Sequence, residues 1–406
     1  MLTKENNELL TRVEGDAPMG RMLQDWYWVP AVRAARLEAD GAPLRVRLFG
    51  RKFVAFRATD GRVGFLDEAC PHRGASLAIA RNEGCGLRCI FHGIKIDVSG
   101  RVSEVPCEPE QGDRLAAKMK VNMYPVRETG GIVWVYLGTR ELPPEFPDLE
   151  FTGLTGDNIV VASSVLDCNW VQGLEATLDS SHVAILHQSF IGRMKAQAQL
   201  AALAAPSYEV ERSNYGLKAV AIRALPDGRN YVRVSNFVMP WFGLTSPNDS
   251  ESGDRAALIA VPIDDTHTLQ WFIRFNTRGP TDKGFAVGAT NYDLDNFTPL
   301  IGGEENNWGQ NRQAMKEGHF TGFDYSHHLV EDMVVQVSMG PVVDRSKEFL
   351  LPSDLAVVQL RRVMLGAVED FMAGKRPCGA GPDIDFPSIR SNAAVLEPGK
   401  AWQEVL

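Results

Sequence analysis

The pattern of apolar and polar positions divides the chain into a strand-rich first part and a second part that mixes strands with helices. Runs of β-branched and aromatic residues within residues 44–66 predict short antiparallel strands, broken by Gly50 and by the Asp60–Gly61 pair. Another β run covers residues 131–137. Prolines in residues 142–147 resist both helix and central strand, so the sequence predicts a domain boundary there.

The second part begins with an alternating run near residues 158–166 and continues into a helical segment over residues 169–187. Later strands are predicted at residues 231–239, 256–263 and 269–276. A helix is expected from Ser353, as N-cap, to Ala373, and it should stop at Gly374. Antiparallel strands with segregated helices are typical of the α+β class.

Length and charge narrow the choice of domain organisation and partners. The 406 residues exceed what one hydrophobic core usually serves, so we expect two domains, residues 1–145 and 146–406. Their 44% apolar and 23% charged residues are ordinary for a globular protein. The net charge of -9, from 42 basic and 51 acidic residues, argues against nucleic acid and anionic membranes as partners.

The first ten residues and the cysteines bear on location. Lys4, Glu5 and Glu8 exclude a secretory apolar core at the start, and no uncharged apolar run is long enough to span a bilayer. Six cysteines in so long a chain are too sparse for a disulfide scaffold. The sequence therefore indicates a cytoplasmic protein in which clustered Cys and His are read first as metal ligands.

One such cluster pairs Cys70-Pro-His72 with Cys89-Ile-Phe-His92, and sixteen residues lie between the two motifs. Each loop offers one thiolate and one imidazole. Thiolates can hold one iron of a [2Fe-2S] cluster while neutral imidazoles hold the other, and such a centre relays single electrons. The alternative is a Cys₂His₂ zinc site, but zinc fingers pair Cys with Cys and His with His, whereas each loop here mixes the two.

The residues around these loops, Cys70-Pro-His-Arg-Gly-Ala-Ser-Leu77 and Leu87-Arg-Cys-Ile-Phe-His-Gly93, resemble the ring-hydroxylating oxygenase branch of the Rieske family. Respiratory-chain Rieske proteins carry two further cysteines here, where this chain has Ala75 and Phe91. Ile94 stands where a tryptophan often follows the His-Gly pair. The other cysteines are expected to be buried small hydrophobes: Cys85, Cys107, Cys168 and Cys378.

A second constellation lies in the predicted helical segment. It comprises Asn169, Trp170, Glu175, Asp179, His182 and His187. Two histidines and one carboxylate on one face of Fe(II) leave coordination positions open for O₂. The histidines are five apart, about 140° around a regular helix, so the helix must loosen or end between them.

This motif resembles the mononuclear iron segment of the same oxygenases, which implies that His182 and His187 are iron ligands. The stretch from Glu331 to Ser346 is similar to the family's third-ligand region, with Asp332 at the ligand position. The other carboxylates considered for that position are Glu331, Asp324 and Asp344. The resemblance covers roughly residues 20–370, is greatest to the phthalate dioxygenase group, and implies an all-β [2Fe-2S] domain followed by a helix-grip-like catalytic domain.

Asp179 lies one helical turn before His182, where a carboxylate can orient the ligand's second nitrogen. The resemblance implies that this acid links His182 to His92 or His72 of a neighbouring subunit, and hence a homotrimer or a hexamer made of two trimers. Glu175 is expected to support the same polar network. Asn169 is counted with both acids among the candidate catalytic residues.

No flavin- or nicotinamide-binding fingerprint and no plant-type ferredoxin motif is present, so the electrons must come from another protein. The resemblance implies an NADH-dependent reductase that carries flavin and a [2Fe-2S] cluster. The expected function is that of a terminal oxygenase that uses O₂ to hydroxylate an aromatic carboxylate such as a phthalate- or phenoxybenzoate-like compound. The alternatives are vanillate-like O-demethylation and a non-catalytic Rieske electron carrier.

A carboxylate substrate requires a buried cation. Arg233 is a candidate, although a surface ion pair on the outer face of a strand is an equal alternative, and Arg193 and Arg223 are comparable choices. Residues 196–206 could form a helix or a mobile lid. The remaining histidines are expected to be surface or core residues and are assigned no role: His267, His319, His327 and His328.

Overall fold

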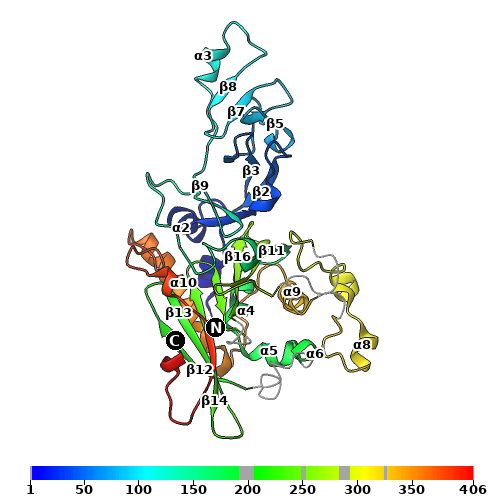
Figure 1. Cartoon of the computed structure of the whole chain (residues 1–406), viewed down its shortest axis with the longest axis vertical. Helices are drawn as coiled ribbons and strands as arrows, with labels where there is room; N and C mark the ends of the chain where they lie inside the picture. Colours follow the sequence, from blue (N-terminus) through cyan, green and yellow to red (C-terminus); the bar gives the residue numbers. More distant parts are fainter. Residues whose placement is uncertain (1, 192–204, 248–252, 283–292, 324–326, 406) are drawn as a thin grey trace. The chain divides into compact units, whose positions relative to one another are not determined.

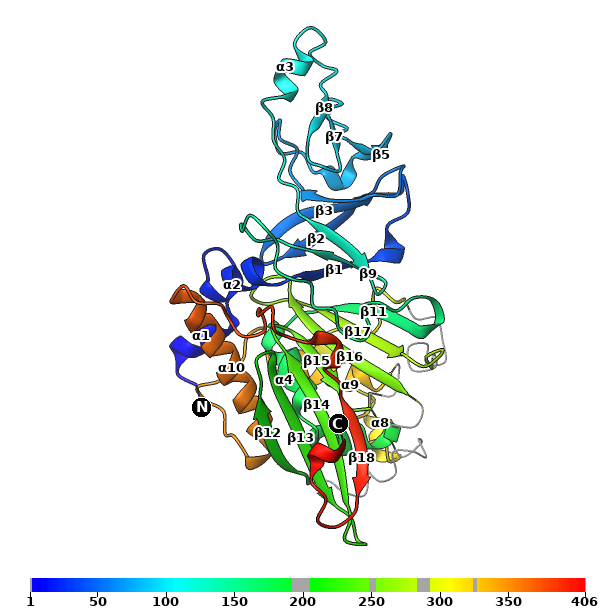
Figure 2. The ribbon, with the colours of Figure 1, turned by 60° about the vertical axis from the view of Figure 1, so that its left-hand side comes forward.

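The computed structural model of the chain describes residues 2–191, 205–247, 253–282, 293–323 and 327–405. The chain forms two compact units (Figures 1 and 2). The smaller unit is Gln24–Phe146, and the larger combines the chain on either side of it. The break after Phe146 is one residue from the expected boundary. We had expected the N-terminal segment to belong to the first domain, but Met1–Leu23 belongs to the larger unit.

Contacts of the first helix explain this grouping of the N-terminal segment. The first two helices are α1 (Lys4–Thr11) and α2 (Pro18–Trp26). The Asn7 side-chain amide donates to the Val343 carbonyl at 2.9 Å, and the Val13 amide donates to the Asp265 carboxylate at 2.7 Å. Helix α1 thereby packs within the larger unit.

The smaller unit consists of three antiparallel sheets, ordered β1-β10-β9, β2-β3-β4 and β5-β6-β7-β8. Its elements are β1 (Val29–Arg33), β2 (Leu44–Leu48), β3 (Arg51–Arg57), β4 (Val63–Asp67), β5 (Arg81–Glu83), β6 (Gly86–Arg88), β7 (Lys95–Asp97), β8 (Val102–Glu104), α3 (Gly112–Ala116), β9 (Val126–Thr129) and β10 (Ile132–Val135). The predicted strands within residues 44–66 are present. The break at Gly50 is a tight turn in which Phe49 and Gly50 have φ of 53° and 73°, as a two-residue hairpin turn requires.

The larger unit is built on an eight-stranded antiparallel sheet in the order β11-β17-β16-β15-β14-β13-β12, with β18 paired to β14. Its strands are β11 (Ile159–Leu166), β12 (Ser207–Arg212), β13 (Gly216–Ala224), β14 (Asn230–Val238), β15 (Phe242–Thr245), β16 (Asp254–Pro262), β17 (Thr268–Asn276) and β18 (Asn392–Leu396). All predicted strands of this part are present. Edge strand β12 carries Glu209, Glu211 and Arg212, charges that discourage pairing with another chain.

The described part of the larger unit also contains six α-helices after α1 and α2. They are α4 (Trp170–Leu178), α5 (Ser181–Leu186), α6 (Gln188–Ile191), α8 (Arg312–Lys316), α9 (Leu329–Ser338) and α10 (Leu355–Met372). Helix α4 lies against β14–β17 and contacts α9, while α10 lies against β12 and β13. These contacts place α4 against the sheet and α9 beside α4, and both helices carry candidate site residues.

Two helical predictions need correction. Ser353 is not the N-cap of α10 but lies in a short 3₁₀ turn before it, although the helix does end before Gly374, whose φ of 73° suits a left-handed C-terminal residue. The predicted segment 169–187 is two helices, because Asp179 is extended and its Oδ1 accepts the Ser181 amide at 2.7 Å to begin α5. Among the described residues, no helix is long and apolar enough to cross a membrane.

Candidate metal centres

The two cysteine loops have the same backbone hydrogen bonds. Cys70 N–H donates to the Ala75 carbonyl and Cys89 N–H to the Ile94 carbonyl, both at 2.8 Å. A glycine amide closes each loop by donating to the cysteine carbonyl at 2.9 Å. Both glycines have φ of 75°, a conformation that glycine adopts without strain. Two loops of one shape therefore present equivalent cysteine and histidine side chains.

The side chains of these loops suit a cluster. Cys70 and Cys89 are buried, and the rings of His72 and His92 have centroids 4.5 Å apart. Burial, together with the neighbouring Cys89, raises the pKa of the Cys70 thiol to about 11. His92 Nδ1 is buried and has no hydrogen-bond partner among the described residues, as expected for a nitrogen that binds metal. Two thiols beside two imidazoles fit a Rieske [2Fe-2S] cluster.

The position of Ile94 beneath the loops is apolar, whereas the four other cysteines differ in burial. Ile94, at the position where tryptophan is common, is 1% exposed and belongs to the apolar core beneath both loops. Of the four cysteines outside the loops, Cys168 is buried as expected. Cys107 is exposed, and Cys85 and Cys378 are half-buried, so the expectation of burial was wrong for Cys107.

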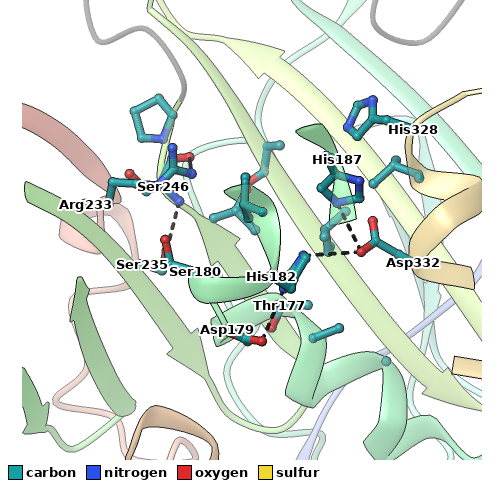
Figure 3. Close-up of a pocket in the computed structure, with 18 of the residues that line it drawn as sticks. Thr177, Asp179, Ser180, His182, His187, Arg233, Ser235, Ser246, His328 and Asp332 are labelled. Carbon is teal, nitrogen blue, oxygen red and sulfur yellow. Dashed lines mark hydrogen bonds and ion pairs between the residues drawn. The ribbon is translucent and has the colours of Figure 1, made fainter. Parts of the chain in front are cut away.

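His182, His187 and Asp332 form the second centre (Figure 3). His182 lies on α5, His187 follows its last residue, and Asp332 lies on α9. Each histidine Nε2 is 3.3 Å from Asp332 Oδ1, and one ligand atom from each residue lies within 4.8 Å of the others. Because α5 ends before His187, the two rings can face the same carboxylate, and no π-type widening occurs in this segment.

A second carboxylate holds the other nitrogen of each histidine. His182 Nδ1 is 3.5 Å from Asp179 Oδ2, and His187 Nδ1 is 2.8 Å from Glu331 Oε2. Thr321 donates its hydroxyl proton to the other oxygen of Glu331. Carboxylates behind ligand histidines fix the ring orientation and raise basicity. Glu331, considered above only as an alternative ligand, is placed to orient His187.

The electrostatics of this centre favour positive charge. Burial disfavours protonated His182, but hydrogen bonds with Asp179 and Asp332 raise its pKa to about 10. Burial likewise opposes protonation of His187, whose pKa is raised to about 9, chiefly by Asp332. Burial would raise the pKa of Asp332, but the two histidines hold it far below its usual range. Two imidazoles that bind protons this firmly beside an ionised carboxylate form a site that suits Fe(II).

Two other candidate catalytic residues have structural contacts instead. Asn169 caps α4 through its side-chain oxygen and donates to the backbone carbonyls of Thr11 and Asp265 at 3.0 and 2.8 Å. Glu175 accepts hydrogen bonds from Arg345 at 2.8 Å and from Arg361 at 2.7 Å, and neither Asn169 nor Glu175 lines the cavity described below. These contacts are structural, and neither side chain lies in the cavity wall.

A cavity of about 140 Å³ adjoins the three-residue centre. Arg233, from β14, lines it and is 6% exposed, which excludes the surface alternative (Figure 3). Arg233 donates to the Ser246 carbonyl at 3.0 Å and to the Tyr231 hydroxyl at 3.5 Å, both uncharged oxygens. Arg223 donates to the Ser180 carbonyl at 2.7 Å and is not part of the lining.

Some predicted residues lie outside the described part of the chain, and some lining residues were not predicted from the sequence. Arg193, Asp324 and most of residues 196–206 lie outside the described residues. Asp344 is half-buried, and its carboxylate accepts a hydrogen bond from the Ser346 hydroxyl. Lining residues that the sequence did not suggest are Arg255, Gln270, Arg274, His328 and Gln336. The available signal was a polar residue inside an otherwise apolar strand or helix, since such a residue faces either a partner or a cavity.

Family comparisons agree with both centres. The family described as Rieske [2Fe-2S] domain matches residues 26–125, and the family described as LigXa C-terminal domain like matches residues 135–405. A Rieske domain followed by a domain with a two-histidine, one-carboxylate centre defines an oxidoreductase with two iron centres.

Full-length relatives show more closely which kind of two-iron-centre oxidoreductase this chain is. The phthalate 4,5-dioxygenase oxygenase subunit of Pseudomonas putida is 39% identical over 422 residues, covering 100% of this chain and 94% of that protein. The 3-chlorobenzoate-3,4-dioxygenase oxygenase subunit of Comamonas testosteroni is 34% identical, covering 99% and 97%. The chain belongs to the Rieske non-haem iron oxygenases of the phthalate dioxygenase group, as a terminal oxygenase subunit. Its cofactors are therefore a Rieske [2Fe-2S] cluster and a mononuclear iron.

Solved structures share the fold. The terminal oxygenase of carbazole 1,9a-dioxygenase from Novosphingobium sp. KA1 has a TM-score of 0.58 at 20% identity, covering 88% of this chain and 97% of that one. The Pseudomonas putida CBB5 NdmA structure has a TM-score of 0.59 at 18% identity, covering 95% and 100%. At these identities the likeness concerns architecture, and the expected α+β fold is confirmed.

Proposed function

We propose that this subunit hydroxylates the ring of an aromatic carboxylate, with O₂ as oxidant and electrons from a separate reductase. The observation that carries the proposal is a cavity with a two-histidine, one-carboxylate centre in one wall and the buried guanidinium of Arg233 in another. The relatives named as phthalate, 3-chlorobenzoate and phenoxybenzoate dioxygenases support the substrate class.

Two sets of residues would bind the two metal centres. Cys70, His72, Cys89 and His92 would hold the cluster, and His182, His187 and Asp332 would hold the mononuclear iron. When bound, the cluster supplies single electrons and the iron activates O₂. The chain's own part is to orient the ligands: Asp179 and Glu331 would each accept a hydrogen bond from a histidine Nδ1–H, which leaves both Nε2 atoms directed at the metal position.

Arg233 would bind the substrate carboxylate. A guanidinium offers paired N–H donors that match a carboxylate, and Arg233 donates to uncharged oxygens. Two further arginines line the cavity, and each pairs with a carboxylate: Arg274 with Asp254 at 3.3 Å and Arg255 with Glu150 at 3.1 Å. Arg233 is our candidate because its guanidinium is buried in the cavity wall.

The proposal also includes an electron-donor protein and an oligomeric state. The electron donor would be an NADH-dependent reductase with flavin and a [2Fe-2S] cluster. Asp179 holds His182 while its side chain stays 30% exposed, so it could reach His72 or His92 of another subunit in a homotrimer or in a hexamer. The cytoplasmic location indicated by the sequence stays a prediction.

The test combines product analysis with one substitution. Protein with both centres loaded would be supplied with a phthalate dioxygenase-type reductase, NADH and ¹⁸O₂, and a panel of benzoates and phthalates would be screened by mass spectrometry. We expect a dihydroxylated or hydroxylated ring carrying ¹⁸O. Arg233→Met should raise KM for the carboxylate about a hundredfold or more while the cluster spectrum is unchanged. Oxidation of uncharged aromatics in preference to carboxylates would contradict the proposal.

A second candidate is O-demethylation. The 5,5'-dehydrodivanillate O-demethylase oxygenase subunit of Sphingobium sp. is 31% identical over 407 residues, covering 97% of this chain and 88% of that protein. The same screen separates the two reactions, because demethylation releases formaldehyde and leaves a phenol, whereas ring dioxygenation releases none. A non-catalytic electron carrier, the remaining alternative, would reduce and oxidise its cluster without forming product.

A further inference from the structure

The junction between α4 and α5 contains the acid that contacts an iron ligand. Asp179 ends α4 with an extended backbone, and its Oδ2 lies 3.5 Å from His182 Nδ1 (Figure 3). From the sheet, the guanidinium of Arg223 donates to the Ser180 carbonyl at 2.7 Å and to the Ser180 hydroxyl oxygen at 3.2 Å. Because Arg223 is 1% exposed and lies on β13, these contacts tie the backbone of the junction to the sheet.

The strand register places Tyr208 on the face of the sheet that bears the site. Tyr208 of β12 and Arg233 of β14 are both Cα partners of Ala221 on β13. Side chains of Cα partners project from the same face of a sheet. Along β12 the exposure alternates, and Tyr208 is half-buried between exposed Ser207 and Glu209. Tyr208 therefore points toward the site, although it does not line the cavity.

The Tyr208 hydroxyl links Ser181 to Asp179. It lies 3.0 Å from Ser181 Oγ and donates to Asp179 Oδ1 at 3.4 Å. The same Oδ1 accepts the Ser181 amide at 2.7 Å. A phenol hydroxyl has one proton, and a carboxylate oxygen is a stronger acceptor than a serine hydroxyl, so the Ser181 hydroxyl donates to Tyr208. This network occupies Oδ1 of Asp179 and leaves Oδ2 to His182.

We propose that Tyr208 is a positioning residue for the iron centre: its hydroxyl fixes the Asp179 carboxylate so that Oδ2 faces His182 Nδ1. This deepens the proposed function and rests on its assignment of His182 as an iron ligand, not on the substrate. Rotation of the carboxylate would break both hydrogen bonds to Oδ1, so Oδ2 keeps its place. His182 in turn keeps Nε2 directed at the metal position.

The length of the contact sets the size of the effect. At 3.4 Å the Tyr208 hydrogen bond is long for two oxygens, whereas Glu331 Oε2 lies 2.8 Å from His187 Nδ1. Tyr208 also acts on the ligand through Asp179 and does not touch it directly. We therefore expect Tyr208 to contribute less to iron binding than Glu331 does.

The test measures ferrous iron affinity by competition with a chromogenic chelator, for protein that carries its cluster. Tyr208→Phe removes only the hydroxyl, whereas Tyr208→Leu also removes the ring. If the hydroxyl positions Asp179, Tyr208→Phe should bind iron roughly three- to fivefold more weakly than the unaltered protein, and Tyr208→Leu at least as weakly. If only the ring matters, Tyr208→Phe should bind iron normally and Tyr208→Leu should not.

A second variant and a control address the network itself. Ser181→Ala keeps the amide that bonds Asp179 but removes the hydroxyl beside Tyr208. Its effect should not add to that of Tyr208→Phe, because both changes break the same network. Tyr215→Phe is the matched control, since Tyr215 is a buried tyrosine of the same unit whose hydroxyl donates to Asn236 Oδ1 at 2.8 Å, away from the cavity lining. It should leave iron affinity unchanged.

A spectroscopic measurement separates orientation of the ligand from general loss of stability. The EPR line shape of the nitric oxide adduct of the ferrous centre depends on how the ligands are arranged around the iron. We expect a single species in the unaltered protein and in Tyr215→Phe. In Tyr208→Phe the signal should broaden or gain a second component, because His182 is held less firmly.

The outcomes distinguish this role from the proposed function. Normal iron affinity in Tyr208→Phe would overturn the positioning role and leave the proposed function standing, and so would an unchanged nitric oxide spectrum. Equal weakening by Tyr215→Phe would also overturn it, because the effect would not belong to this network. If the unaltered protein binds no iron beyond its cluster, the proposed function and the positioning role fail together. The EPR signal of the reduced cluster shows that each variant is folded.

Discussion

The cluster loops and the iron centre reach metal-binding geometry by opposite routes. Each cluster loop carries its cysteine and histidine within four residues and is shaped by its own backbone hydrogen bonds. In the iron centre, His187 contacts carboxylates of α9 that are far away in sequence. Glu331, for example, is 144 residues from His187. A local loop depends on its own sequence, whereas the iron centre depends on how α4, α5 and α9 pack on the sheet.

This difference predicts that the two centres can be removed separately. Cys70→Ala should eliminate the cluster, so iron falls from about three to about one per chain and the EPR signal of the reduced Rieske centre disappears. His187→Ala should lower iron to about two while that signal persists. Both variants should lose oxygenation entirely. Iron unchanged at about two per chain in both the unaltered protein and His187→Ala would mean that the second centre does not bind iron.

Ion pairs between residues far apart in sequence should contribute to the free energy of unfolding of the iron-binding domain. Glu175 pairs with Arg345 and Arg361, whose side chains are no more than 5% exposed. Glu175→Gln removes the carboxylate that Arg345 pairs with and leaves Arg361 with Glu348, and we expect a loss of about 3 kcal/mol in the free energy of unfolding, measured with urea. Glu404→Gln, at an exposed pair with Lys400, should change it by less than about 0.5 kcal/mol.

The same pair gives a pH dependence of defined sign. Burial would raise the pKa of Glu175, but Arg345 and Arg361 hold it below its usual value. A lowered pKa in the folded state contributes stability above the unfolded value, about 4.5, and that contribution is lost as pH falls further. Unfolding free energy should therefore fall less steeply below about pH 4.5 in Glu175→Gln than in the unaltered protein. Parallel curves would contradict the pairing.

Orientation of His187 is a smaller effect that concerns the iron centre alone. Glu331→Gln keeps the shape of the side chain but removes its charge, so iron should bind about 10- to 100-fold more weakly, as followed by competition with a chromogenic ferrous chelator. The cluster EPR signal should be unaltered. Glu317→Gln, at an exposed position, serves as the control. Unchanged iron affinity would show that Glu331 does not orient the ligand.

The smallest effect compares the two cluster loops with each other. Gly74 and Gly93 have the same φ of 75°, but a Cβ atom on Gly93 would lie 2.7 Å from Pro106 Cγ, whereas nothing lies within 4 Å at Gly74. Gly74→Ala should cost about 1 kcal/mol, and Gly93→Ala should cost more. Thermal loss of the cluster absorption measures both. A larger loss for Gly74→Ala would contradict the difference in packing.

Sequence reasoning worked where ligands are local. The mixed cysteine and histidine loops, and the spacing of His182 and His187 with a distant Asp332, are visible in the printed chain because each motif occupies one short segment or one recognisable stretch. Alternating apolar residues likewise predicted the strands that are now β11, β14, β16 and β17. The strands could be predicted because the alternation of side chains along a strand is already present in a few consecutive residues.

Only the tertiary structure decided what surrounds those ligands. Asn169 and Glu175 stand beside the iron motif in sequence, yet they cap a helix and pair with distant arginines. Glu331 and Gln336 are separated from His187 along the chain, yet α9 brings both to the cavity region. Sheet register and helix packing set such neighbours, and they depend on the whole folded chain, so no local pattern contains them.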